Sequence, residues 1–157
     1  MLSENLLFFY NIGTENKQGG GRMYRQHNVN PVGKHVGDCT VRAISAAIGK
    51  SWEEVYIELC FEGFLMSDMP SANRVWGAYL KRHGFIREPV PDVCPECYTV
   101  EDFCREHPRG IYVLATPGHV VCIEDGCWYD TWDSGQETPI YCFMRKENEE
   151  CTEITTE

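Results

Sequence analysis

A chain of 157 residues with 43% hydrophobic side chains is long enough for one domain with an ordinary core and short for two. Its 24 acidic and 14 basic side chains give a net charge of −10 with no basic stripe, so we expect no nucleic-acid partner. The early apolar run Leu6–Tyr10 is too short for a signal core, and no stretch approaches membrane-spanning length. These features predict a cytoplasmic protein without membrane contact.

The chain divides into three parts. Residues 1–24 are predicted to form an N-terminal extension, with an edge strand in 1–13 and a glycine-rich flexible loop at 14–22. Residues 25–146 contain the periodic segments of a folded domain. Residues 147–157 are acidic and without periodicity, which predicts a disordered tail.

Helical periodicity comes first in this domain and strand patterns follow. Apolar spacing, capping residues and helix-ending glycines predict helices at 39–48, 51–62, 71–83 and 99–107. After a connecting loop at 89–95 and the last of these helices, strands are expected at 111–116, 119–124, 127–132 and 139–145. The order predicts an α+β fold in which N-terminal helices pack on a C-terminal antiparallel β-sheet.

Cys39 is predicted to occupy the first position of the helix at 39–48, because Asp38 is a typical N-cap residue and Gly49 ends the pattern. A thiol at the positive end of a helix dipole has a lowered pKa, as a nucleophile needs. The carboxylate of Asp38 opposes this effect unless it caps the backbone N–H groups. The alternative interpretation of Cys39 is a buried, inert cysteine.

A β-hairpin is predicted around the turn signal Asp125-Gly126. With these two residues in the loop, alternation places His119, Asp130 and Trp132 on one face. His119 and Asp130 then become diagonal neighbours with Cα atoms roughly 7–8 Å apart, so the carboxylate can hold the imidazole. A slip of one residue would select Asp133 in place of Asp130. Taken alone, His119 is also consistent with an ordinary surface histidine at a strand end.

These segments resemble the papain-like cysteine peptidase superfamily, in its compact bacterial and phage-encoded versions. The segment from Asp130 to Trp132 looks like the family's Asn-Ser-Trp, and Gly118-His119 looks like its histidine strand. The resemblance covers roughly residues 30–145 and implies a papain-like fold over 25–146. It implies Cys39 as nucleophile, His119 as general base and acid, and Asp130 as the residue that orients the histidine. Trp132 would shield the histidine–aspartate pair.

The second donor of an oxyanion hole is the point where the chain departs from this family. The family has a glutamine shortly before the cysteine, whereas here Gly33 to Gly37 contain no amide side chain. Asn30, which precedes a proline, is our candidate, with Gln26 and Asn28 as the nearest alternatives.

The nine cysteines are an odd number, and several continue apolar patterns, which favours free thiols in a reducing compartment. Cys94, Cys97, Cys104 and His107 have donor types that zinc accepts, but their spacing suits no common finger. Cys104 and His107 also fit a core-facing helical stripe, and we therefore expect no metal and no cofactor. A redox role for the Cys94-Cys97 pair is a further alternative.

Other charged and titratable residues receive ordinary interpretations. Arg42 is expected to be solvated, with a salt bridge or a substrate carboxylate as alternatives, while His27, His35 and His83 are expected at the surface or as caps.

The sequence predicts a cysteine hydrolase that cleaves a peptide, isopeptide or related amide bond through a thioester, with a peptide or protein as substrate. The alternative is an inactive papain-fold binding or regulatory module, with or without a structural zinc. The two differ in whether Cys39 is an activated thiol.

Overall fold

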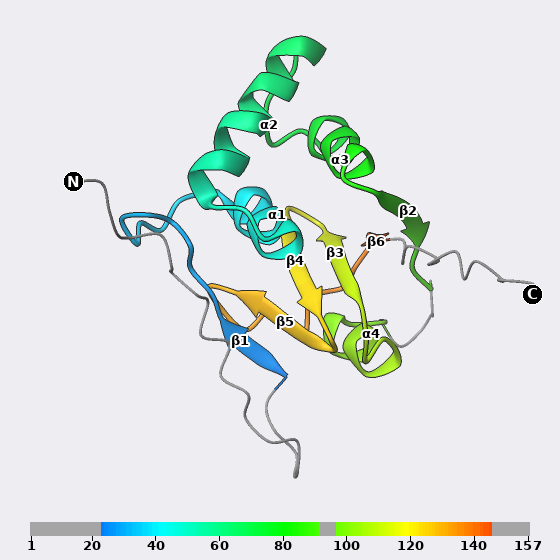
Figure 1. Ribbon diagram of the computed structural model, residues 1–157. Coiled ribbons are helices and arrows are strands. Elements are labelled where there is room, and N and C mark those ends of the chain that lie inside the picture. The colour runs from blue at the N-terminus through cyan, green and yellow to red at the C-terminus, as the bar shows by residue number, and fades with distance from the viewer. Residues whose placement is uncertain (1–22, 92–96, 146–157) are drawn as a thin grey trace, which may run out of the picture.

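The computed structural model describes residues 23–91 and 97–145 (Figure 1). The edge strand expected in 1–13, the glycine-rich loop at 14–22 and the acidic tail at 147–157 lie outside these residues. No helix in the described part of the chain combines the length and the apolar character needed to cross a bilayer.

The described residues form four helices and six strands, which confirms the α+β class. The helices are α1 (Cys39–Ile48), α2 (Trp52–Met66), α3 (Asn73–Arg82) and α4 (Val100–Glu106). The strands are β1 (Tyr24–Gln26), β2 (Phe85–Pro89), β3 (Ile111–Thr116), β4 (His119–Glu124), β5 (Cys127–Asp130) and β6 (Tyr141–Arg145).

The sheet has the strand order β1-β5-β4-β3-β6-β2. The expectation of a purely C-terminal, antiparallel sheet is wrong in two respects. β1 pairs parallel to β5, while the other neighbours are antiparallel, so the sheet is mixed. Both edge strands, β1 and β2, precede all of the predicted C-terminal strands in the chain, and Tyr24, assigned above to the extension, belongs to β1.

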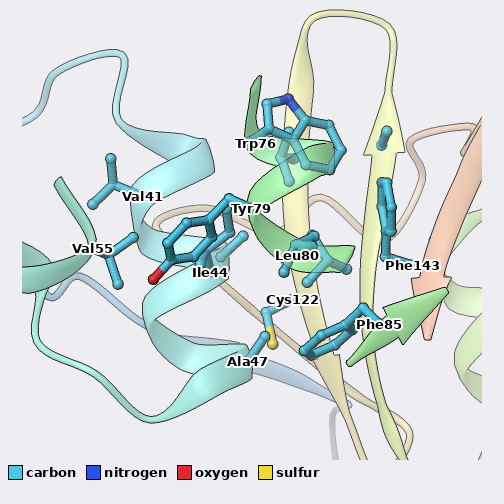
Figure 2. Close-up of a cluster of buried hydrophobic side chains, with 14 of the residues drawn as sticks. Val41, Ile44, Ala47, Val55, Trp76, Tyr79, Leu80, Phe85, Cys122 and Phe143 are labelled. Carbon is cyan, nitrogen blue, oxygen red and sulfur yellow. The ribbon is translucent and has the colours of Figure 1, made fainter. Parts of the chain in front are cut away.

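Helices cover both faces of this sheet. Figure 2 shows the larger core cluster, where side chains from α1, α2 and α3 pack on Cys122 of β4 and Phe143 of β6. Alternate residues of the same strands, among them Leu114, Val121 and Ile123, form a second cluster with Phe103 of α4. Because successive side chains in a strand point to opposite faces, α4 lies on the face opposite α1.

The position of α1 decides where Cys39 lies. Val41, Ile44 and Ala47 are buried, and the helix contacts β4 and α2. It ends at Gly49, whose φ of 71° is left-handed. The first turn of α1 is thereby held beside the beginning of β4.

Candidate active site

The β4–β5 hairpin forms in the predicted register. Asp125 and Gly126 have φ values of 47° and 72°, as a tight two-residue turn requires. Glu124 pairs with Cys127, and Ile123 pairs with Trp128. His119 therefore begins one strand of the hairpin and Asp130 ends the other, as expected from the turn signal.

His119 and Asp130 are hydrogen-bonded, with 2.6 Å between Nε2 of the imidazole and Oδ2 of the carboxylate. Asp130 is buried, at 3% exposure. Its Oδ2 also accepts a hydrogen bond of 2.7 Å from the Ser134 hydroxyl, and its Oδ1 accepts one of 2.7 Å from the Thr131 N–H. These donors fix the carboxylate, which in turn leaves Nδ1 of His119 as the ring nitrogen available to another partner.

Cys39 is half-buried, and its thiol interacts with the His119 side chain through hydrogen bonding and charge, both of which lower the thiol pKa. Burial alone raises the pKa of the Cys39 thiol. The hydrogen bond and charge of His119, the N–H of Val120 and the hydroxyl of Thr40 outweigh burial, so the net pKa is below the ordinary value. By contrast, burial raises the pKa of Cys104 to about 12 and that of Cys142 to about 11.

The pKa values of His119 and Asp130 shift in opposite directions. Burial disfavours the imidazolium, but the hydrogen bonds and charges of Asp130 and Cys39 raise the pKa of His119 to about 9. Burial raises the pKa of Asp130, and its hydrogen bonds to His119 and Ser134 bring it below the usual value. Near neutral pH these shifts favour a thiolate beside an imidazolium.

Arg42, one turn into α1, is buried at 7% exposure, so the expectation of a solvated charge is wrong. Its guanidinium pairs with Oδ1 of Asp38, and its Nη2 lies 3.6 Å from Oδ1 of Asp130. The two carboxylates come from residues distant in sequence, and a buried charge needs such partners. The salt-bridge alternative describes Arg42 correctly.

Asp38 is at the N-cap position of α1, but its side chain makes no capping hydrogen bond. Besides the Arg42 guanidinium, its carboxylate accepts hydrogen bonds from Nε1 of Trp52 at 2.9 Å and from Nδ2 of Asn30 at 3.3 Å. The negative charge next to Cys39 is thus neutralised by Arg42 instead of by the helix N-terminus.

Asn30 organises the loop that leads into α1. Its Nδ2 donates to Asp38, while its Oδ1 accepts from the N–H groups of Val32 and Lys34 at 3.2 and 3.1 Å. An oxyanion role for Asn30 stays a prediction, and it would use the second hydrogen of this amide. The alternatives are also bonded: Gln26 donates to the Thr131 carbonyl, and Asn28 accepts from the Asn30 N–H. The N–H of Cys39, at the first position of α1, can supply one donor without any side chain.

Two further side chains lie around the histidine–aspartate pair. The Trp132 ring is 5.3 Å from the His119 ring, centroid to centroid, and is 45% exposed, so it covers the pair only in part. Nε2 of His27 is buried and finds no hydrogen-bond partner among the residues that the structure describes. Burial and the charge of Arg42 lower the pKa of His27, while Asp130 raises it less. His27 is therefore half-buried next to the charged network, not at the surface as expected.

The residues of the alternative zinc site are separated in what the structure describes. Cys94 lies outside the described residues, Cys97 is exposed and Cys104 is buried at 1% exposure. Nδ1 of His107 bonds the Phe103 carbonyl at 3.0 Å. Among residues 23–91 and 97–145, no three His, Cys, Asp or Glu side chains gather as a metal site requires.

Sequence reasoning missed three polar contacts of the site: the Thr40 hydroxyl on Cys39, the Ser134 hydroxyl on Asp130, and Asp130 as a partner of the Arg42 bridge. The first two were accessible in principle, because a hydroxyl one to four residues from a charged group often bonds it. The Arg42 bridge joins α1 to β5, and no local pattern indicates it.

A cavity of about 540 Å³ opens beside the start of α1, next to Cys39. It lies between the loop 30–38, the first turn of α1, one face of α2 and the turn 69–71 that follows α2. Asp38 and Thr40, the neighbours of Cys39 on both sides, line it. We name it the α1–α2 pocket.

The cysteine, histidine and aspartate proposed from the sequence thus lie together, joined by hydrogen bonds, at the junction of α1 with the β4–β5 hairpin. No family model, curated protein or solved structure matches this chain.

Proposed function

We propose that the protein is a cysteine hydrolase with a papain-like arrangement, in which Cys39 is the nucleophile, His119 the general base and acid, and Asp130 the orienting carboxylate. The observation that supports this most is the 2.6 Å hydrogen bond between Asp130 and His119, with Cys39 close enough to the same imidazole for its thiol pKa to be lowered by it. It is accompanied by a lowered pKa of the thiol and a raised pKa of the imidazole.

In the first half-reaction the Cys39 thiolate attacks the carbonyl carbon of an amide, forming a C–S bond while the carbonyl π electrons move to oxygen. The N–H of Cys39 would donate to this oxyanion, with Asn30 as candidate second donor. The tetrahedral species collapses, the C–N bond breaks, and imidazolium His119 gives its proton to the leaving amine. A thioester on Cys39 and a neutral imidazole remain.

In the second half-reaction His119 removes a proton from water, and the resulting hydroxide attacks the thioester carbonyl. The C–S bond breaks, which releases a carboxylic acid and restores the thiolate–imidazolium pair. An amine in place of water would give acyl transfer, and the triad alone does not distinguish these reactions. Peptide and protein amides, including isopeptides, are the substrates we propose.

The decisive experiment measures the rate at which iodoacetamide alkylates each cysteine between pH 5 and 9, using mass spectrometry on the full chain. The exposed Cys97 is the internal reference thiol. We expect Cys39 to react faster than Cys97 below pH 7, and to lose this advantage in His119→Ala. His35→Ala, at an exposed histidine, is the matched control and should leave the rate unchanged.

Peptide amides of aminomethylcoumarin then test turnover, which should disappear in Cys39→Ser. If Cys39 shows no advantage over Cys97 at any pH, the hydrolase proposal fails and a binding module without turnover becomes the better account of this site.

A further inference from the structure

The α1–α2 pocket and the histidine are formed by different elements around Cys39. Asp38 and Thr40 line the pocket, which extends toward α2. His119 and the Val120 N–H, which bond the sulfur, belong to β4. A substrate held by the sulfur would therefore have its leaving group near β4 and could place an adjacent group in the pocket.

The surface of the pocket is mainly apolar. Val41 and Leu59 are buried at 8% and 1% exposure, and the stacked rings of Trp52 and Tyr56, 4.8 Å apart, come from the same face of α2 as Leu59. Ligand pockets of this size bury most of a small organic group.

Apolar side chains at the mouth of the pocket are unusually exposed. Val32 is 79% exposed, Met69 is 67% exposed and Tyr56 is 45% exposed, and all three line the pocket. They come from three different segments and surround one opening. A bound apolar group would remove part of this surface from water, which is favourable.

The charged groups around the pocket also disfavour basic substrate side chains. The carboxylate that lines it, that of Asp38, is buried and already bonded to Arg42, Trp52 and Asn30. A basic substrate side chain would find no free partner there and would lose its hydration. Lys34, at the exposed rim, adds repulsion.

We infer that the α1–α2 pocket is a specificity pocket that binds a large apolar side chain of the substrate, aromatic or branched aliphatic, next to the bond that Cys39 attacks. This inference rests on the proposed function of Cys39. It identifies the substrate class as peptides with a bulky apolar residue within two positions of that bond, and it excludes basic residues there.

Chloromethyl ketones test this without a known substrate, because the Cys39 thiolate displaces chloride and forms a stable C–S bond. We would compare N-acetyl dipeptide chloromethyl ketones of the sequences Gly-Gly, Phe-Gly, Gly-Phe, Lys-Gly and Gly-Lys. The measured quantity is the second-order rate of Cys39 alkylation in the full chain. One of the two phenylalanine compounds should react at least on the order of 10-fold faster than the Gly-Gly and lysine compounds.

Two matched variants test whether the preference for phenylalanine compounds arises from the α1–α2 pocket. Met69→Asp places a charge at its mouth and should reduce the phenylalanine preference at least about 5-fold. Phe64→Asp makes the same kind of change at an exposed residue of α2 outside the pocket lining, and should leave the preference intact. Both positions are exposed, so folding is not threatened.

Iodoacetamide, too small to fill the pocket, separates the two proposals. Fast alkylation of Cys39 by iodoacetamide together with equal rates for all five ketones would overturn the pocket and leave the hydrolase proposal intact. Equal loss of preference in Met69→Asp and Phe64→Asp would also overturn it. Slow alkylation by iodoacetamide at every pH would count against the hydrolase proposal itself.

Discussion

Arg42 links α1, the helix that begins with Cys39, to β5, the strand that ends with Asp130. Its guanidinium lies between Asp38 and Asp130, and all three side chains are at most 8% exposed. Removing one partner from a buried ionic cluster leaves charges without compensation, which is much more costly than breaking a pair at the surface.

Arg42→Met should therefore lower the free energy of unfolding by about 3–5 kcal/mol. Urea denaturation followed by tryptophan fluorescence measures this loss. Arg105→Met is the control, because Arg105 pairs with Glu101 at 61% side-chain exposure and should cost less than about 1 kcal/mol. Equal losses in the two variants would contradict the structural role of the Arg42 bridge.

The raised pKa of His119 depends on Asp130. In Asp130→Asn the imidazole loses a charged acceptor, so its pKa should fall from about 9 toward the usual value. NMR titration of the His119 ring measures it. Asp133→Asn, at the carboxylate that a one-residue slip would have selected, should leave the His119 pKa near 9, because Asp133 bonds Trp128. A His119 pKa that moves in Asp133→Asn and not in Asp130→Asn would reverse the assignment.

At this scale, sequence reasoning placed Cys39, His119 and Asp130 because each is tied to a local signal: a helix start, a strand start and a hairpin register. It did not identify Asp130 as a partner of Arg42, or Trp52 and Asn30 as donors to Asp38, because these partners come from other segments of the chain. Asp38 was expected to cap α1, and tertiary contacts with Arg42 and Trp52 replace that local bond.

Among the elements, the β4–β5 hairpin is the one whose local sequence most directly determines the geometry of the candidate site. The Asp125-Gly126 turn sets the register, and the register makes His119 and Asp130 diagonal neighbours on adjacent strands. β1 and β2 were missed for a physical reason. β1 has three residues with polar, exposed positions, and β2 contains charged residues and ends at Pro89, so neither shows a buried strand pattern.

Gly126→Ala should destabilise the protein by about 1–3 kcal/mol. The φ of 72° is strained for alanine, and the added Cβ would lie 3.1 Å from the Cys104 carbonyl oxygen. Gly37→Ala is the control, because nothing lies within 4 Å of its Cβ and its φ is not left-handed. Thermal unfolding compares the two. A Gly126→Ala protein as stable as Gly37→Ala would mean that the turn does not hold the hairpin.

For the whole molecule, the buried histidine makes folding stability depend on pH. The folded pKa of His119 is above its unfolded value of 6.5, so its contribution is complete below about pH 6.5 and is lost as the pH rises toward 9. The stability contributed by Cys39 depends on pH in the opposite sense, because its thiol pKa is lowered in the folded protein. Cys39→Ser removes this contribution. We expect the stability of Cys39→Ser to fall above pH 6.5 more steeply than that of Cys39→Ser/Asp130→Asn, because Asp130 still raises the imidazole pKa after the contribution of Cys39 is removed. Urea denaturation at several pH values measures both slopes, and equal slopes would contradict the histidine–aspartate coupling.

The strand order also determines the order in which contacts of the site can form during synthesis of the chain. Tyr24 and Asp130, joined by a hydrogen bond across the β1–β5 pair, are 106 residues apart in sequence, and β6 fills an interior position of the sheet although it comes last. A chain emerging from the ribosome therefore exposes Cys39 long before the hairpin with His119 exists. Contacts of such sequence separation form late and slowly. The newborn protein carries an ordinary thiol, and the lowered pKa arises only when synthesis of the sheet is nearly complete.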